Sequence, residues 1–190
     1  MSLRLDLLRH GETELGGGLR GSIDDALTDA GWQQMRAAVL DHGPWNVIVS
    51  SPLQRCARFA EELAAQLGLP VEQEADFQEL HFGDWEGQSP AQLMETDAAG
   101  LGRFWEDPYA FTPPNGEPVQ AFASRVLAAV ERLQNAHDGK RVLLISHGGV
   151  MRLLLAHARG LPREQLLQVS VPHGGLFGLD VLADGQLMER

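Results

Sequence analysis

The chain has only one cysteine among its 190 residues. A single thiol cannot form an intrachain disulfide, so the fold must rest on a hydrophobic core, which a chain of this length can bury. A lone cysteine also fits a reducing compartment, and we expect a cytoplasmic protein. Cys56 itself falls within a predicted helix, where we expect it to pack as a small apolar residue.

Long apolar runs and a surplus of basic residues are also missing. No segment is long and apolar enough to cross a bilayer, and the start of the chain has Asp6 within its apolar stretch and no small-residue cleavage site. We therefore expect a soluble protein without a secretory signal. Lys and Arg number 15 against 26 Asp and Glu, a formal charge of −11. This charge disfavours nucleic acid and anionic membranes as partners.

A small anion can still bind to an acidic protein of this kind. It requires a local pocket of cations, because charges farther away than about 8 to 10 Å are largely screened by salt. The sequence therefore has to be searched for basic residues that the fold could bring together.

Short apolar runs alternate with helical patterns along the whole chain. Strands are predicted at residues 3–8, 45–50, 141–146, 167–171 and 176–181. Helices are predicted from the cap Thr28 to near Gly43, from Ser51-Pro52 to Leu67, after Ser89-Pro90, over 118–137 and 150–159, and briefly from Leu161-Pro162. The stretch from Leu69 to Gly87 is expected to be irregular. The alternation predicts an α/β fold, a three-layer sandwich with a mostly parallel central sheet flanked by helices.

Residues 97–117 are rich in glycine, proline and aromatic side chains, which is typical of a covering segment. We interpret residues 1–190 as a single domain with a lid-like insert at about 88–117. The aromatic residues of the insert could stack on a flat base of a substrate, or give the loop a small core of its own. They are Phe104, Trp105, Tyr109 and Phe111.

Two histidines stand where predicted strands end, each followed by glycine. His10 follows the run that ends in Leu7-Leu8-Arg9, and His147 follows Leu143-Leu144-Ile145-Ser146. In open α/β sheets, ligands bind at the carboxyl edge of the strands. A neutral imidazole has an unprotonated nitrogen that can attack phosphorus, so His10 is the candidate nucleophile.

Hydrolysis of a phosphate monoester also needs cations around the phosphoryl group and an acid for the leaving oxygen, which arginine and glutamate can supply. Arg9 adjoins His10, and Arg55 falls in the first turn of a helix, an end that favours anions through its dipole and free N–H groups. Guanidinium groups match phosphate oxygens two at a time, and His147 would add a donor once a dianion protonates it. Glu79 has apolar neighbours that favour its protonated form, so it is the candidate acid for the leaving oxygen.

Four motifs in one order carry a resemblance that covers nearly the whole chain. They are Arg9-His10-Gly11, Ser51-Pro52-Leu53-Gln54-Arg55, Glu79 ahead of Phe82-Gly83-Asp84-Trp85-Glu86-Gly87, and Ser146-His147-Gly148-Gly149. Together they resemble the histidine phosphatase superfamily, also called phosphoglycerate mutase-like. The sequence departs from the pattern at Gly16, where many members have a phosphate-contacting asparagine, and at Ala26, where proline is common.

The resemblance implies a role for each matched residue. His10 is the nucleophile that becomes phosphorylated, Glu79 is the proton donor, and Arg9, Arg55 and His147 line the phosphate pocket. We also assign Gly21, His81 and Gly148 to substrate binding, although His81 could equally be a surface residue beside Glu79. No metal and no cofactor are expected.

Within the superfamily, the segments Phe82–Gly87 and Pro114-Asn115-Gly116-Glu117 look most like α-ribazole-5′-phosphate phosphatases of cobalamin biosynthesis. The short insert favours hydrolysis over the mutase reaction. The alternatives are a broad-specificity or sugar-phosphate phosphatase, a phosphoglycerate mutase, and a non-catalytic module that binds a phosphorylated ligand. We expect a small phosphomonoester as the partner, and a monomer or homodimer.

Overall fold

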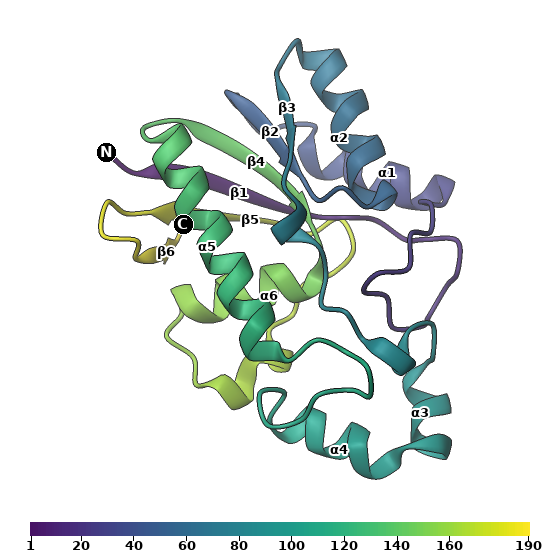
Figure 1. Ribbon diagram of the computed structural model, residues 1–190. Coiled ribbons are helices and arrows are strands. Elements are labelled where there is room, and N and C mark those ends of the chain that lie inside the picture. Colours follow the sequence, from purple (N-terminus) through teal and green to yellow (C-terminus); the bar gives the residue numbers. More distant parts are fainter.

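A computed structural model describes residues 1–190 as a sheet of six strands with helices on both faces (Figure 1). The strands are β1 (Leu3–Arg9), β2 (Val47–Ser50), β3 (Val71–Gln73), β4 (Arg141–Ser146), β5 (Leu176–Val181) and β6 (Leu187–Glu189). The α-helices are α1 (Asp29–Val39), α2 (Gln54–Leu67), α3 (Pro90–Thr96), α4 (Ala98–Glu106), α5 (Val119–His137) and α6 (Gly148–Ala158). Three short 3-10 helices complete the fold, η1 (Ala75–Phe77), η2 (Gly83–Trp85) and η3 (Arg163–Gln168).

The strands lie in the order β3-β2-β4-β1-β5-β6. The first four are parallel to one another, whereas β5 is antiparallel to its neighbour β1 and β6 is antiparallel to β5. The predicted mostly parallel α/β sheet is confirmed. Arg9 is paired with Ser146 in the register of β1 and β4, so the residues that follow these strands emerge side by side.

Alternate residues of the central strands supply two separate cores. On β1, Leu7 belongs to the larger core, which includes residues of α5 and α6, and Leu8 belongs to the smaller core with residues of α1 and α2. Successive side chains of a strand point to opposite faces, so a continuous apolar run fits a sheet that is covered on both sides. Figure 1 shows α1 and α2 on one face and α5 and α6 on the other, which confirms the three-layer prediction.

Several predicted helix boundaries are confirmed by cap geometry. The hydroxyl of Thr28 accepts a hydrogen bond from the Gly31 N–H, and Ser89 forms a capping box with Gln92 ahead of Pro90. Helix α2 ends on Gly68 in the left-handed conformation with φ 65°, as predicted. A glycine adopts this conformation at little cost because it has no Cβ.

The predicted start of α2 at Ser51-Pro52 is wrong by two residues. The helix begins at Gln54, and its N-cap residue, Leu53, has no side-chain cap. Ser51 is engaged elsewhere, because its hydroxyl lies 2.8 Å from Nε2 of His147. Arg55 still falls in the first turn.

The predicted strand at 167–171 does not form. Its first residues belong to η3, and the carbonyls of Val169 and Val171 accept hydrogen bonds from the side chains of Arg152 and Arg9. These carbonyls are used by guanidinium groups and not by a strand ladder.

Two strands, one α-helix and the 3-10 helices η1 and η2 were not predicted, and one helix starts earlier than expected. Strand β3 is a three-residue edge strand with exposed side chains, and β6 pairs with β5 through a tight turn. Helix α4 occupies part of the segment that was expected to be a covering loop. Helix α6 begins at Gly148, not at Val150.

Aromatic side chains join the insert to the body of the protein. The rings of Trp85 and Phe104 are 5.7 Å apart and edge-on, and the rings of Trp85 and Phe111 are stacked at 5.5 Å. Trp105, by contrast, is 52% exposed. Phe104 belongs to the larger core of the protein and Phe111 packs against that core, so these aromatic residues do not form the separate small core that was one of the two predicted alternatives. The lid-like nature of residues 88–117 stays a prediction.

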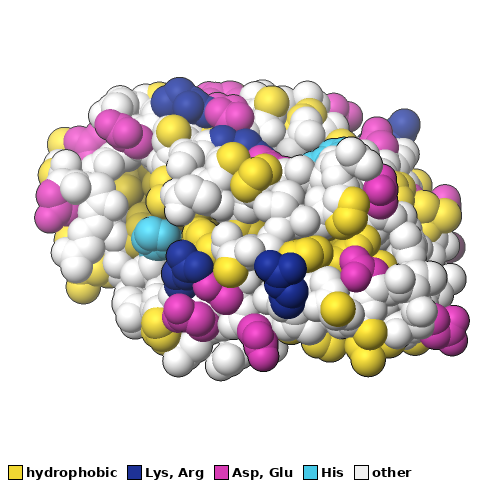
Figure 2. Space-filling model, turned by 60° about the horizontal axis from the view of Figure 1, so that its bottom comes forward, with side chains coloured by type: hydrophobic (Ala, Val, Ile, Leu, Met, Phe, Trp, Pro, Cys, Tyr) yellow, Lys and Arg dark blue, Asp and Glu magenta, His cyan; other side chains and the backbone are white.

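Figure 2 shows acidic and basic side chains interspersed over one face of the molecule, with hydrophobic side chains gathered in its hollowed middle. Basic side chains do not form a continuous patch on this face, as the negative net charge leads one to expect. None of the helices is long and apolar enough to span a membrane.

Candidate active site

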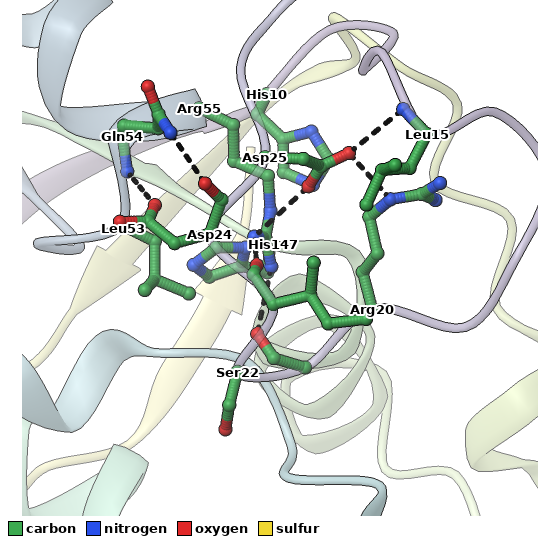
Figure 3. A network of polar contacts seen from close by, with 12 residues as sticks. His10, Leu15, Arg20, Ser22, Asp24, Asp25, Leu53, Gln54, Arg55 and His147 are labelled. Carbon is green, nitrogen blue, oxygen red and sulfur yellow. Dashed lines mark hydrogen bonds and ion pairs between the residues drawn. The ribbon is translucent and has the colours of Figure 1, made fainter. Parts of the chain in front are cut away.

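The ends of β1, β2 and β4 meet at one edge of the sheet and bring the predicted site residues together. The His10 N–H donates to the carbonyl of Ser146 at 3.1 Å. The rings of His10 and His147 lie 5.4 Å apart, at an angle of 64°. Figure 3 shows these rings with the guanidinium group of Arg55, which comes from the start of α2. Residues from distant parts of the sequence thus share one small region.

His10 is buried with one ring nitrogen free. Its Nδ1 lies 2.8 Å from the carbonyl oxygen of Gly11, and because a carbonyl can only accept, Nδ1 carries the hydrogen. The second nitrogen, Nε2, is left with its lone pair. Burial, followed by the charge of Arg55, holds the pKa of His10 well below its ordinary value. The imidazole is therefore neutral at neutral pH, the state that a nucleophile requires.

His147 is fully buried beside Ser51 and Cys56. Burial and then the charge of Arg55 hold its pKa well below the ordinary value, so the ring is neutral in the free protein. Its predicted protonated state thus requires the charge of a bound anion. Burial also raises the pKa of the neighbouring Cys56 to about 12, which keeps this thiol neutral. Cys56 packs in α2, as predicted.

Arg55 is fully buried and held by the loop that follows β1. Its Nη2 donates to the carbonyl of Gly21 at 3.0 Å, and its Nη1 donates to the carbonyl of Ile23. Asp25 forms a wider ion pair with Arg55 at 3.7 Å and a close one with Arg20 at 2.8 Å (Figure 3). Asp25 thereby joins two cations, and the orientation of Arg55 is fixed from several directions.

The sequence-based expectation of free backbone N–H groups at the start of α2 holds only in part, because the first N–H of the helix is occupied. The carboxylate of Asp24 accepts a hydrogen bond from the Gln54 N–H at 2.7 Å, and the Ser51 hydroxyl accepts one from Leu53 at 3.3 Å. The carboxylate of Asp24 thus lies at the N-terminus of α2, where the helix dipole favours negative charge. The N–H of Arg55 has no hydrogen-bond partner within the protein, so α2 offers a ligand this N–H as well as the side chain of Arg55.

Arg9 lies against the start of α6. Its Nη1 donates to the carbonyl of Val171 at 2.6 Å, and a Cβ on Gly148 would lie only 3.1 Å from its Nε. Arg152, on the next turn of α6, comes equally near to Gly148, with Nη1 at 3.0 Å from that Cβ position. Burial, followed by the charge of Arg152, lowers the pKa of Arg9. Two guanidinium groups are therefore held around the glycine that starts the helix.

Two buried donors of this cluster have no hydrogen-bond partner, namely Nε of Arg9 and Nε of Arg55. Buried polar groups are almost always paired, because an unpaired one loses its hydration without compensation. Unpaired donors on two arginines beside two neutral imidazoles favour the binding of an anion. A phosphate group has the charge and the number of acceptor oxygens to use them.

Glu79 lies at the N-terminus of α6, on the other side of Gly148. Its Oε2 accepts a hydrogen bond from the Gly149 N–H at 2.8 Å, and its Oε1 accepts one from the Leu80 N–H at 2.9 Å. The backbone around it is bound by Arg125 of α5, which donates to the carbonyls of Asp76, Gln78 and Glu79 at 2.7, 2.8 and 3.0 Å. The carboxyl group is therefore fixed in position.

A small apolar pocket of about 60 Å³ opens beside Glu79. Glu79, Gly149 and Arg152 line its polar end. The remaining lining is apolar and comes mostly from α4, α5 and η3: Leu80, Phe82, Phe104, Pro108, Val119, Phe122, Leu166 and Leu167.

Not every predicted substrate-binding residue points to the phosphate site. The Gly21 N–H donates to the carboxylate of Glu86, and the Gly21 carbonyl accepts a hydrogen bond from Arg55. Gly21 therefore positions Arg55. His81 is exposed, and its Nδ1 accepts a hydrogen bond from the Gly83 N–H at 3.1 Å. That contact stabilises a local turn, in keeping with the surface alternative.

Sequence reasoning missed four residues that the fold places at or behind the site: Asp25, Arg125, Arg152 and His173. Arg152 could have been suspected, because it follows His147 by five residues and so lies near the same end of the helix. His173 stands with its ring 5.7 Å from that of His10. No motif marks His173, which comes from a turn between η3 and β5.

Fold and site together define an α/β protein in which two histidines and two arginines gather at one edge of the sheet. The chain belongs to the histidine phosphatase superfamily (branch 1), which matches it over residues 5–190. This membership confirms the family and the class of enzyme predicted from the four motifs.

Individual relatives agree with this membership. The chain is 33% identical to an adenosylcobalamin/α-ribazole phosphatase of Escherichia coli (strain K12), over 94% of this chain and 90% of that protein. It is 37% identical to a glucosyl-3-phosphoglycerate phosphatase of Mycolicibacterium vanbaalenii, over 84% of this chain and 75% of that protein. The crystal structure of the α-ribazole phosphatase from Shigella flexneri resembles it with a TM-score of 0.84 at 31% identity, over 98% of this chain and 94% of that chain.

Proposed function

We propose that the protein hydrolyses phosphate monoesters without a metal, through a phosphohistidine intermediate on His10. The observation that carries the proposal is the free Nε2 of a buried, neutral His10 beside two arginines, each with an unpaired buried Nε. Phosphoryl transfer depends mainly on positioning and on cations that spread the charge of the transferring group. The cations in this protein would be Arg9, Arg55 and His147, the last of which gains a proton next to the bound dianion.

The reaction proceeds in two transfers. First, Nε2 of His10 attacks phosphorus, the P–N bond forms and the P–O bond to the alcohol breaks, while protonated Glu79 gives its proton to the leaving oxygen. Glu79 is then a carboxylate and takes a proton from the water that attacks the phosphohistidine. The P–N bond breaks, inorganic phosphate leaves, and both His10 and Glu79 return to their starting states.

For the substrate, we propose α-ribazole 5′-phosphate. Two of the relatives described above are named for α-ribazole, and both cover most of this chain. The apolar pocket beside Glu79 also fits a substrate whose leaving group has a flat, apolar base. Its volume of about 60 Å³ leaves room for the edge of such a base.

A phosphorylated sugar acid is the second candidate. It is favoured by the 37% identity to the glucosyl-3-phosphoglycerate phosphatase and by Arg152. This guanidinium lines the same pocket, next to Glu79, where it could hold a carboxylate of the leaving group.

The substrate is tested by measuring kcat/KM for α-ribazole 5′-phosphate, glucosyl-3-phosphoglycerate, 3-phosphoglycerate and fructose bisphosphate. We expect α-ribazole 5′-phosphate to have the highest value, and we expect Phe104→Leu to lower it more than the values for the others. Trp105→Leu is the matched control, because Trp105 lies on the same helix but is 52% exposed. A preference for glucosyl-3-phosphoglycerate that Arg152→Gln abolishes would replace the first candidate by the second. No turnover of any phosphomonoester would favour a binding module.

A further inference from the structure

His173 is a third imidazole at the site, and nothing in the proposed reaction uses it. Its ring lies 5.7 Å from the ring of His10, nearly as close as that of His147, with an angle of 41° between the planes. His147 is fully buried, whereas His173 faces solvent. The two rings therefore contact His10 in different surroundings, one in the interior and one at the entrance.

The backbone fixes His173 in this position. The Arg9 N–H donates to the carbonyl of Gly175 at 3.0 Å, and the Gly174 N–H donates to the carbonyls of Arg9 and His10 at 3.2 and 3.4 Å. Gly174 has φ 67°, a conformation that favours glycine, and it packs against the backbone of Gln34 in α1. The turn that carries His173 is thus bound directly to the residue proposed as nucleophile.

The ring of His173 forms no hydrogen bond within the protein, although charged groups surround it. Arg9 and His10 approach from the end of β1, Glu12 from the loop that follows, and Arg20 from the glycine-rich segment. Burial, followed by the charge of Arg9, lowers the pKa of His173. In the free protein the ring is therefore neutral, with one N–H available and no partner for it.

We propose that His173 is a further phosphate-binding residue, which donates a hydrogen bond to the phosphoryl group on the solvent side of the pocket. The proposal rests on the function proposed above. The other donors, Arg9, Arg55 and His147, approach from the interior. A phosphoryl group on Nε2 of His10 would leave an oxygen toward the entrance, where this imidazole stands.

Binding a dianion would also favour protonation of His173, because it adds negative charge beside the ring. Its contribution to phosphate affinity should therefore grow as the pH falls from about 8 to about 6, on either side of the ordinary histidine pKa of about 6.5. A residue that only shaped the turn would not have this dependence.

The test measures the dissociation constant of inorganic phosphate between pH 6 and pH 8 for the wild type, His173→Ala and His173→Asn. We expect His173→Ala to weaken binding about tenfold at pH 6 and less at pH 8, as the loss of a charge-assisted hydrogen bond predicts. His173→Asn should recover part of the affinity, because its amide donates, but without the pH dependence. His42→Ala is the control, since His42 is an exposed histidine on the turn between α1 and β2.

The proposal would be overturned if His173→Ala bound phosphate within about twofold of the wild-type affinity at both pH values. The loss of a hydrogen bond to a charged group weakens binding by more than this. Equal losses of phosphate affinity at both pH values, with no recovery of affinity in His173→Asn, would also overturn it, because they indicate that His173 only shapes the turn. Either result, with wild-type turnover intact, leaves the proposed function standing. A wild type that neither binds phosphate nor turns over a phosphomonoester would remove both.

Discussion

Gly149 shows how a single residue without a side chain determines the position of the proposed acid. A Cβ at this position would overlap Oε1 of Glu79, while the Gly149 N–H holds Oε2 at 2.8 Å. At Gly148, one residue earlier, a Cβ would lie only 3.1 Å from Nε of Arg9. The two glycines allow an acid and a cation to approach the same helix end.

We expect Gly149→Ala to lower kcat/KM for alkyl phosphates by about a hundredfold, because displacing a catalytic group by about 1 Å has an effect of this size. Aryl phosphates should lose less, since their leaving groups need less protonation. Gly102→Ala in α4 is the control, because a Cβ there meets nothing within 4 Å. If Gly149→Ala turned over alkyl phosphates as fast as the wild type does, Glu79 would not be the acid.

Residues next to a motif were predictable from the sequence, and isolated residues were not. The five predicted residues all stand in motifs, and the fold brings them together: His10, Arg9, Arg55, Glu79 and His147. Their proposed roles stay predictions. Asp25 and His173 reach the site through long-range packing, which no local pattern of charge or hydrophobicity reveals, whereas the helical spacing of Arg152 from His147 indicates its position.

At the scale of elements, α5 acts on the site from a distance. Its residue Arg125 donates to the Asp76, Gln78 and Glu79 carbonyls and forms a two-pronged ion pair with Glu117 at 2.8 and 3.0 Å. The planar guanidinium group can serve all these acceptors at once, and an ammonium group cannot. The segment that carries Glu79 has no regular structure of its own, so this clamp determines where it lies.

We expect Arg125→Lys to lower the free energy of unfolding by about 1 to 3 kcal/mol, since buried acceptors lose their donors. It should also lower kcat for alkyl phosphates more than for aryl phosphates, because the carboxyl of Glu79 becomes less well placed. Urea denaturation and steady-state kinetics measure the two effects. Arg132→Lys, at an exposed position on the same helix where the guanidinium pairs only with the half-buried Glu74 and Asp76, should change stability by less than about 1 kcal/mol. Equal effects of the two substitutions would contradict the clamp.

Long elements were predicted best because their hydrophobic period is unambiguous. The strands at 3–9 and 141–146 and the helix at 119–137 lie where expected. The three-residue β3 and β6 are too short to show a period, and their exposed residues look like loop. At 167–171, an apolar run typical of a strand was overridden by contacts of its carbonyls with Arg9 and Arg152.

At the scale of the whole molecule, the site reduces stability in acid. His10, His147 and His173 have lower pKa values in the folded protein than in an unfolded chain. Below about pH 6.5, the unfolded state therefore binds more protons than the folded state does. The free energy of unfolding should therefore fall as the pH drops from about 6.5 to about 5, by up to about 1.4 kcal/mol per pH unit for each histidine.

Urea denaturation at a series of pH values checks this expectation. His10→Asn should reduce the slope by about one histidine's share. A free energy of unfolding that is constant across this pH window would show that the three imidazoles accept protons freely in the folded protein.

The transfer of phosphorus to the imidazole of His10 is tested most directly by rapid-quench labelling with a ³²P-phosphomonoester. The account predicts acid-labile, alkali-stable label that approaches one phosphoryl group per chain, lies on His10 and forms as fast as product. His10→Asn should take up none. Turnover by the wild type without any labelled protein, or label that persists in His10→Asn, would contradict it.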